Sequence, residues 1–408
     1  MMANPKGLRA VAFCLALAIL SCRGEAPTKS SSPEMLRRLV DSLKAPVERV
    51  TGLRFKSTPR SALRTREQVR DYLVRKLDQE LPTQKMQGLE TAYRLFGMLP
   101  DTLELRGLLL DLYTEQVAGY YDPDSATLFG VAGADPAQLR LVLAHEMVHA
   151  LQGQYLPLDS LLHEPANNDR LTAAQAVLEG QATLASIDVL AAGQNVSSNP
   201  EFWDMYREQV REQQSSMPVF AKAPLIVREA LIFPYLAGAE FMHWWKEQKR
   251  DSVPYGSRMP VSTEQILFTD RYARGDVPVT LAFPTDSGIV YEDVLGEGEI
   301  RVLMSQLAGL SEVRNRGPIG WGGDRYRVYR TPAGPALVWY VVWDDARSAE
   351  RFIWGYGGKL RSSARKGYRT AVESVDLEGK PGMMYVLAPE TWTGWERVPK
   401  AHLAVEGR

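Results

Sequence analysis

Two histidines and a glutamate stand close together in an order that suits metal-dependent hydrolysis. His145 and His149 are four residues apart in the string His-Glu-Met-Val-His. On a helix this spacing places both imidazoles on one face, so that both can bind the same ion. Glu146 can act as general base on a water held by that ion without being a ligand itself. The motif predicts a zinc-dependent peptidase, with His145 and His149 as ligands and Glu146 as the catalytic residue.

A catalytic zinc ion needs a third protein ligand and an open position for water. The metzincin pattern has a further histidine six residues after the second one, but Tyr155 stands there. Glu179 lies 30 residues after His149, in a helical pattern rich in small residues. Small residues allow two helices to approach closely, and Gly180, which costs about 1 kcal/mol inside a helix, needs such a packing reason. We therefore predict Glu179 as the third ligand, the alternative being a solvent-facing glutamate.

The elements that position these residues can be predicted from capping residues and turns. Asp135 followed by Pro136 predicts the start of the motif helix, and Gly153 predicts its end after Gln152. A hairpin is expected before it, with strands at 118–121 and 126–131, and the helix carrying Glu179 is expected at 171–192. Other helical patterns cover residues 33–50, 65–81, 83–98, 102–116, 206–214 and 226–249.

The sequence pattern changes near residue 280, where glycines and short strand patterns replace the helical patterns. Strands are predicted at 325–330, 336–343 and 383–388, and a helix at 345–356. The expected fold class is α+β. We expect a mainly helical zincin-like catalytic domain with a small sheet at residues 34–280 and a small α+β module at 281–408. The aromatic residues that alternate along 339–343 are expected to be core residues.

Composition narrows the possible functions and the possible ligands. Of the 408 residues, 45% are hydrophobic and 24% are charged, which is typical of a soluble globular protein. The net charge of -1 argues against nucleic acid as a partner. Both cysteines lie within the first 22 residues, so neither a thiolate metal site nor a disulfide is expected in the folded part.

The first residues have the layout of a bacterial lipoprotein leader. Lys6 and Arg9 precede an apolar run that is too short to cross a bilayer as a mature helix. The run ends in Ile-Leu-Ser-Cys at Cys22, which resembles a lipobox. We expect residues 1–21 to be a signal peptide, Cys22 to be lipidated and residues 22–33 to be a tether, the alternative being an ordinary signal peptide. The lipid anchor predicts a location in the bacterial cell envelope, facing the periplasm or the exterior.

Several strings resemble the gluzincin group of metallopeptidases, and within it a set of bacterial secreted proteins. They are VLAHEMVHALQ at residues 142–152 and LEGQA at 178–182, preceded by GYYD at 119–122. FPYLAG at 233–238, STEQIL at 262–267 and GWGGD at 320–324 are also similar to segments of that set.

The resemblance implies a zinc site of two histidines and one glutamate, His145, His149 and Glu179, with Glu146 as general base. It also implies that the strand near Tyr120 is an edge strand that pairs with an extended substrate. Some gluzincins have an aspartate four residues after the ligand glutamate that orients a histidine, whereas Thr183 stands there in this chain.

A peptidase also needs a donor for the oxyanion that forms at the scissile carbonyl. Tyr235, Tyr272 and His243 are candidates by position, the alternative being ordinary packing of these rings. The expected function is a membrane-tethered zinc metalloendopeptidase that acts on peptides or proteins. The alternative is a lipoprotein without catalytic activity that uses a zincin fold as a binding or scaffold domain.

Overall fold

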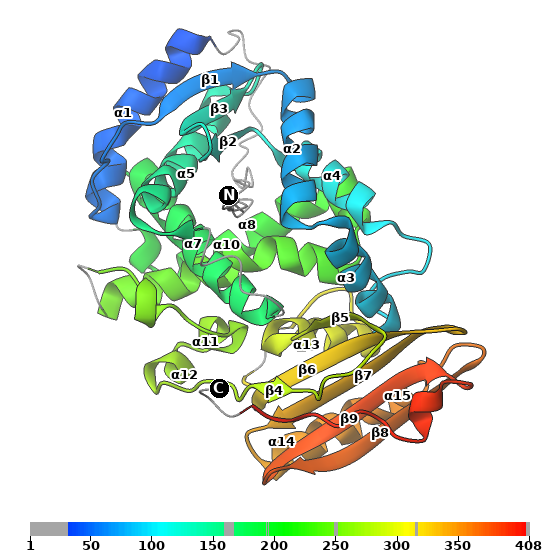
Figure 1. Ribbon diagram of the computed structural model, residues 1–408. Helices are drawn as coiled ribbons and strands as arrows, with labels where there is room; N and C mark the ends of the chain where they lie inside the picture. Colours follow the sequence, from blue (N-terminus) through cyan, green and yellow to red (C-terminus); the bar gives the residue numbers. More distant parts are fainter. Residues whose placement is uncertain are drawn as a thin grey trace, which may run out of the picture.

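The computed structural model describes residues 32–158, 167–192, 194, 196–248, 252–314 and 317–404. The expected leader, Cys22 and nearly all of the tether lie outside these residues. The fold is α+β: helices and a small sheet form the N-terminal part, and an antiparallel sheet dominates the C-terminal part (Figure 1). Within the described part of the chain, no helix is both long and apolar enough to span a membrane.

The N-terminal part is built mainly of helices around a central one, α7. In chain order the helices are α1 (Pro33–Thr51), α2 (Arg66–Glu80), α3 (Thr83–Leu95), α4 (Leu105–Gln116), α5 (Pro136–Tyr155), α7 (Asn168–Leu190), α8 (Pro200–Ser215), α9 (Pro218–Lys222), α10 (Leu225–Gln248), α11 (Thr263–Leu267) and α12 (Thr269–Ala273). Helix α7 packs against both α5 and α10, and α1 packs across α5 and α7 (Figure 1). The helix with Glu179 is therefore held from several sides.

A three-stranded sheet lies beside α5 and has the strand order β1-β3-β2. Strands β2 (Gly119–Asp122) and β3 (Thr127–Val131) form the predicted antiparallel hairpin. Strand β1 (Arg60–Arg64) runs parallel to β3 and was not expected from the sequence. The order places β2 at the edge of the sheet, next to α5.

The C-terminal part is an antiparallel five-stranded sheet with the order β5-β6-β7-β9-β8. Its strands are β5 (Ile289–Asp293), β6 (Trp321–Thr331), β7 (Gly334–Trp343), β8 (Tyr368–Leu377) and β9 (Lys380–Pro389). Helices α13 (Gly296–Leu307), α14 (Ala346–Phe352) and α15 (Gly358–Arg361) accompany the sheet, and β4 (Leu281–Ala282) pairs with β10 (His402–Leu403). Trp339 and Tyr340 are buried on opposite faces of β7, so the alternating aromatic run is core, as expected.

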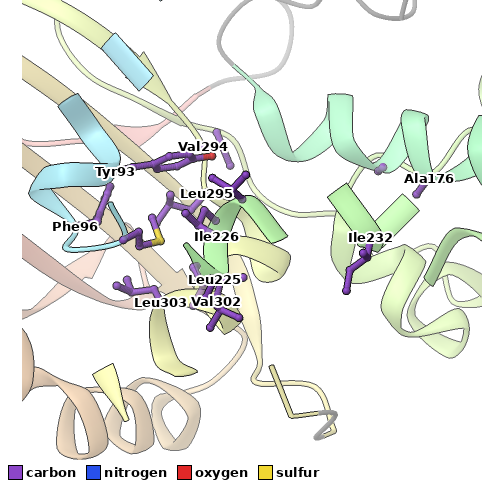
Figure 2. Close-up of a cluster of buried hydrophobic side chains, with 14 of the residues drawn as sticks. Tyr93, Phe96, Ala176, Leu225, Ile226, Ile232, Val294, Leu295, Val302 and Leu303 are labelled. Carbon is purple, nitrogen blue, oxygen red and sulfur yellow. The ribbon is translucent and has the colours of Figure 1, made fainter. Parts of the chain in front are cut away.

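A continuous apolar core joins the two parts. Figure 2 shows Tyr93 and Phe96, at the end of α3, in one buried cluster with Leu225 at the start of α10 and Leu303 of α13. The ring of Phe96 also meets the ring of Trp339 edge to face, with centroids 5.5 Å apart. The sheet is therefore packed firmly against the helices.

Two predicted helices have different limits in the structure and one strand was missed, each for an identifiable reason. Gly153 does not end the motif helix, which continues to Tyr155 with Gly153 in helical conformation. The predicted helix at 345–356 is divided, because α14 ends at Phe352 and a π-helical turn follows. Strand β8 was missed, since its outward face is polar and gives little hydrophobic signal.

One buried carboxylate lies where the sheet meets the helices. Asp324 of β6 accepts hydrogen bonds from the backbone N–H groups of Leu295 and Gly296 and from the indole N–H groups of Trp321 and Trp339, at 2.9 to 3.1 Å. Burial raises the pKa of Asp324 to about 6 despite these four donors. Asp324 is the last residue of the string GWGGD, so this part of the resemblance concerns a residue that stabilises the fold and not the metal centre.

Further buried carboxyls surround the starts of α7, α11 and α13. Asp169 accepts hydrogen bonds from the backbone N–H of Thr263, at 3.1 Å, and from its hydroxyl. Burial raises the pKa of Asp169 to about 8 and the pKa of Glu299 well above its usual range. Burial and the charge of Glu297 together raise the pKa of Glu264 to about 9. The folded protein thus retains protons that the unfolded chain releases near pH 4.

We expect the free energy of unfolding to fall as pH rises from about 5 to 8, because the folded state binds more protons than the unfolded state across this window. Asp169→Asn keeps an oxygen that accepts from Thr263 but cannot ionise. Chemical denaturation at several pH values should show a shallower slope for this variant, by up to about 1.4 kcal/mol per pH unit. Replacing the exposed Asp111 by Asn should leave the slope unchanged. Parallel curves for Asp169→Asn and wild type would contradict this expectation.

Candidate metal centre

Helix α5 presents the motif inside the protein. Asp135 accepts hydrogen bonds from the backbone N–H groups of Ala137 and Gln138, at 2.8 and 3.0 Å, which confirms the predicted N-cap. The helix is apolar on nearly every side and is enclosed by α1, α7 and the small sheet. The polar side chains of His145 and His149 therefore face the interior of the protein, where they require partners.

Helix α7 comes closest to α10. A Cβ atom added to Gly180 would lie 2.2 Å from the carbonyl carbon and oxygen of Gly238 in α10. The expected packing reason for Gly180 is thus real, although the tight contact is made with α10 and not with the motif helix. Small residues serve α5 as well, because Ala182 and Ala185 join the same apolar cluster as Met147. Both contacts fix the turn of α7 that carries Glu179.

We expect Gly180→Ala to lower the free energy of unfolding by about 1–3 kcal/mol, the usual cost of overpacking. The added methyl would overlap backbone atoms of Gly238, which cannot rotate away as a side chain can. Urea unfolding measures the effect. Gly358→Ala is the matched control, because a Cβ there meets nothing within 4 Å. Equal stability of Gly180→Ala and wild type would show that the two helices separate without cost.

The structure brings His145, His149 and Glu179 together. The Nε2 atom of His145 lies 3.0 Å from Oε2 of Glu179, and Nε2 of His149 lies 3.5 Å from the same oxygen. One ligand atom of each residue lies within 4.8 Å of the other two. Ligand atoms about 2.0–2.2 Å from a tetrahedral ion are roughly 3.3–3.6 Å apart, so the observed spacing is close to that of the ligands of one metal ion.

Burial adds a second argument for a metal ion. The exposed fractions are 5% for His145, 3% for His149, 5% for Glu179 and 0% for Glu146. The Nε2 atom of His149 is buried and has no hydrogen-bond partner among the residues that the structure describes. An orphaned nitrogen that faces a carboxylate oxygen is a suitable ligand position. The set of two imidazoles and one carboxylate suits zinc.

The electrostatics of the cluster favour positive charge beside Glu179. Burial lowers the pKa of His145 below its usual value. Burial acts in the same direction at His149, but the charge of Glu179, whose carboxylate lies 3.5 Å from Nε2, outweighs it and raises the pKa of His149 to about 9. Burial would raise the pKa of Glu179, yet the charge of His149 and the contacts with both imidazoles hold it well below its usual range. Glu179 is therefore an anionic ligand at neutral pH.

Glu146 faces the edge of β2 that pairs with no further strand in the described part of the chain. The N–H of Val131 donates to the carbonyl of Ala118, so these two residues form a hydrogen-bonded pair of the hairpin. Since such pairs alternate along the strands, the backbone groups of Gly119 and Tyr121 point away from β3. The outward N–H of Tyr121 donates to Oε2 of Glu146 at 2.7 Å. The predicted general base and the backbone of the edge strand are thus in direct contact.

A network of amides holds His149 from its other side. The Nδ1 atom of His149 lies 2.8 Å from Oε1 of Gln152. The amide nitrogen of Gln152 donates to the carbonyl of Leu178 and to Oε1 of Gln181, both at 2.9 Å. The hydroxyl of Tyr255 also donates to Oε1 of Gln181. These contacts were not expected from the sequence, although Gln152 stands three positions after His149 and therefore shares its helix face.

Tyr235 is the one of the three candidate oxyanion donors that contacts a predicted metal ligand. Its ring stacks on the imidazole of His145, with ring centroids 5.9 Å apart. His243 lies elsewhere on α10, with its ring 5.3 Å from that of Trp203 and its Nε2 atom 3.5 Å from Glu247. Tyr235 is therefore the candidate donor that the geometry retains.

Tyr120 and Tyr272 have other surroundings. The ring of Tyr120 stacks on Tyr72 and Phe129, with centroids 4.3 and 5.1 Å apart, on the face of β2 away from α5. Tyr272 donates its hydroxyl to the carbonyl of Arg258 at 2.7 Å. At β2 it is the backbone of the edge strand, and not the ring of Tyr120, that meets the site.

Comparison with known proteins concerns only the C-terminal sheet. Residues 286–391 match the model of a domain of unknown function, DUF8575. This interval contains β5 to β9 and ends before β10. No curated protein and no solved structure matches the chain. The match does not reach the metal centre, whose interpretation rests on its own geometry.

Proposed function

We propose that the protein is a zinc-dependent peptidase. The proposal rests mainly on one observation: His145, His149 and Glu179 converge on one buried point. Glu146 lies on α5, the helix that carries the two histidines. Three protein ligands leave a fourth position for water, as in catalytic zinc sites. The resemblance to gluzincins assigns the same roles to the same four residues.

Each residue has a definite task in the proposed reaction. When bound, zinc would lower the pKa of a water molecule toward about 7 and polarise the scissile carbonyl. The carboxylate of Glu146 takes a proton from the attacking water and later delivers it to the leaving amine. Tyr235, whose ring stacks on that of His145, is the proposed donor to the oxyanion.

The proposed substrate is an extended peptide or protein segment. The outer edge of β2 pairs with no further strand among the described residues, and the outward backbone groups of Gly119 and Tyr121 lie at that edge. An extended peptide that pairs with this edge would add a strand to the sheet, a common mode of peptide binding. The N–H of Tyr121 is held by Glu146, so the peptide would pair through the other outward groups of the strand, and its backbone would then lie next to Glu146.

Hydrolysis of an unfolded protein tests the proposal. The zinc-loaded full chain should cleave casein, a zinc chelator should stop the cleavage and added zinc should restore it. Cleavage that persists at full strength in the chelator, with zinc removal verified by mass spectrometry, would exclude a zinc-dependent mechanism.

One observation favours the alternative of a metal-holding scaffold domain. The four site residues are almost fully buried, as in sites where a metal stabilises a fold. A scaffold requires the three ligands but not the general base. Glu146 at the edge strand supports the peptidase, and substitution of Glu146 separates the two functions.

We also propose that the protein is tethered to the bacterial envelope through lipidated Cys22. The proposal rests on the leader-like sequence before Cys22. Cys22→Ala should move the protein from the membrane fraction to the soluble fraction, as measured by immunoblotting after cell fractionation. Retention of the variant in membranes at the wild-type level would rule out this anchor.

A further inference from the structure

The side-chain amide of Gln152 has a single orientation that satisfies its neighbours. Gln152 is buried, and one end of its amide lies 2.9 Å from the backbone carbonyl of Leu178. A carbonyl oxygen can only accept a hydrogen bond, so the NH₂ end of Gln152 must face Leu178. The second hydrogen of the same NH₂ group points to Oε1 of Gln181, at 2.9 Å. The amide oxygen of Gln152 must therefore face His149.

This orientation fixes the imidazole of His149. The amide oxygen of Gln152 lies 2.8 Å from Nδ1 of His149, and an amide oxygen can only accept. Nδ1 must therefore carry a hydrogen. In the neutral ring the lone pair is then on Nε2, the buried nitrogen that lies 3.5 Å from Glu179. Gln152 thus selects the tautomer in which His149 can bind a metal through Nε2.

The same amide connects two metal ligands. Leu178, which accepts from Gln152, directly precedes Glu179 on α7. Gln181, the second acceptor, is in turn held by the hydroxyl of Tyr255. A shift of Gln152 would therefore disturb both the ring of His149 and the turn of α7 that carries Glu179.

We propose that Gln152 is the positioning residue of the metal site. In some gluzincins an aspartate four residues after the ligand glutamate orients a histidine. Here that position is Thr183, whose hydroxyl is buried without a hydrogen-bond partner in the described part of the chain. Gln152 supplies an orienting acceptor from α5, on the same helix as the histidine that it holds. This role rests on the proposed zinc function.

Zinc affinity of the full chain, measured by competition with a chromophoric chelator, tests the role. Gln152→Met keeps the length of the side chain but removes its three hydrogen bonds. It should weaken zinc binding about 10- to 100-fold, the usual effect of losing a group that orients a ligand. Thr183→Val is the matched control and should bind zinc like wild type. Gln181→Met, which removes one acceptor and leaves Leu178, should weaken binding less, and it serves if Gln152→Met does not fold.

A spectroscopic measurement separates positioning from general packing. In ¹H–¹⁵N spectra of the side chains, wild type should show a slowly exchanging Nδ1–H proton at His149, and Gln152→Met should lose this signal while keeping its circular dichroism spectrum. Wild-type affinity in Gln152→Met, or in Gln181→Met if only that variant folds, would overturn the role of Gln152. Equal weakening by Thr183→Val would overturn it too. If wild type itself binds no zinc, the proposed function fails, and the role of Gln152 fails with it.

Discussion

Glu146→Gln should abolish peptide cleavage while zinc stays bound at the wild-type stoichiometry. Glutamine has the same shape, and its oxygen can still accept from the N–H of Tyr121, so the local structure is expected to persist. It cannot take a proton from water, and loss of such a general base costs about 10²- to 10⁴-fold in rate. Initial rates of casein cleavage and zinc content by mass spectrometry measure the two properties on the same sample.

The exposed Glu208 on α8 provides the matched control, and Glu208→Gln should retain full activity. Wild-type cleavage by Glu146→Gln would contradict the assignment of the general base. If neither wild type nor Glu146→Gln cleaves while both bind zinc, the scaffold alternative holds and the peptidase is excluded.

Glu179→Ala should remove high-affinity zinc binding. Glu179 is the only anionic ligand of the cluster, and without it two buried imidazoles must hold a divalent cation alone. Removing a group that only orients a ligand weakens metal binding by about 10- to 100-fold. We expect the loss of zinc affinity in Glu179→Ala to be greater than this. Competition with a chromophoric chelator measures it.

Asp188→Ala is the control on the same helix. Asp188 makes an ion pair with Lys246 at 2.7 Å and should not affect zinc binding. Unchanged zinc affinity in Glu179→Ala would show that the third ligand is another group, even though the three side chains converge.

The sequence predicts those parts of the structure that depend on local signals. Asp135 and Pro136 define the start of α5, because an N-cap and a first-turn proline act within a few residues. The hairpin before α5 follows from the turn at residues 122–125 in the same way. The fold class is α+β, as expected from the change from helical to strand patterns near residue 280.

Other features depend on residues far apart in the chain and give no local signal. Strand β1 joins β3 in parallel across more than sixty residues, and its alternating pattern is weak. The close contact of Gly180 could be anticipated from composition, but its partner Gly238 could not. The histidine pair and the candidate third ligand could be selected from residue type and spacing, whereas the contact of Tyr121 with Glu146 depends on the register of the sheet.

X-ray absorption at the zinc edge of the zinc-loaded full chain tests the central claim most directly. A site made of His145, His149 and Glu179 predicts one zinc ion per chain, with a first shell of only nitrogen and oxygen at about 2.0–2.2 Å and scattering from two imidazole rings. The same spectrum should be lost in Glu179→Ala. A shell without imidazole scattering, or a spectrum that Glu179→Ala leaves unchanged, would contradict zinc binding at this site.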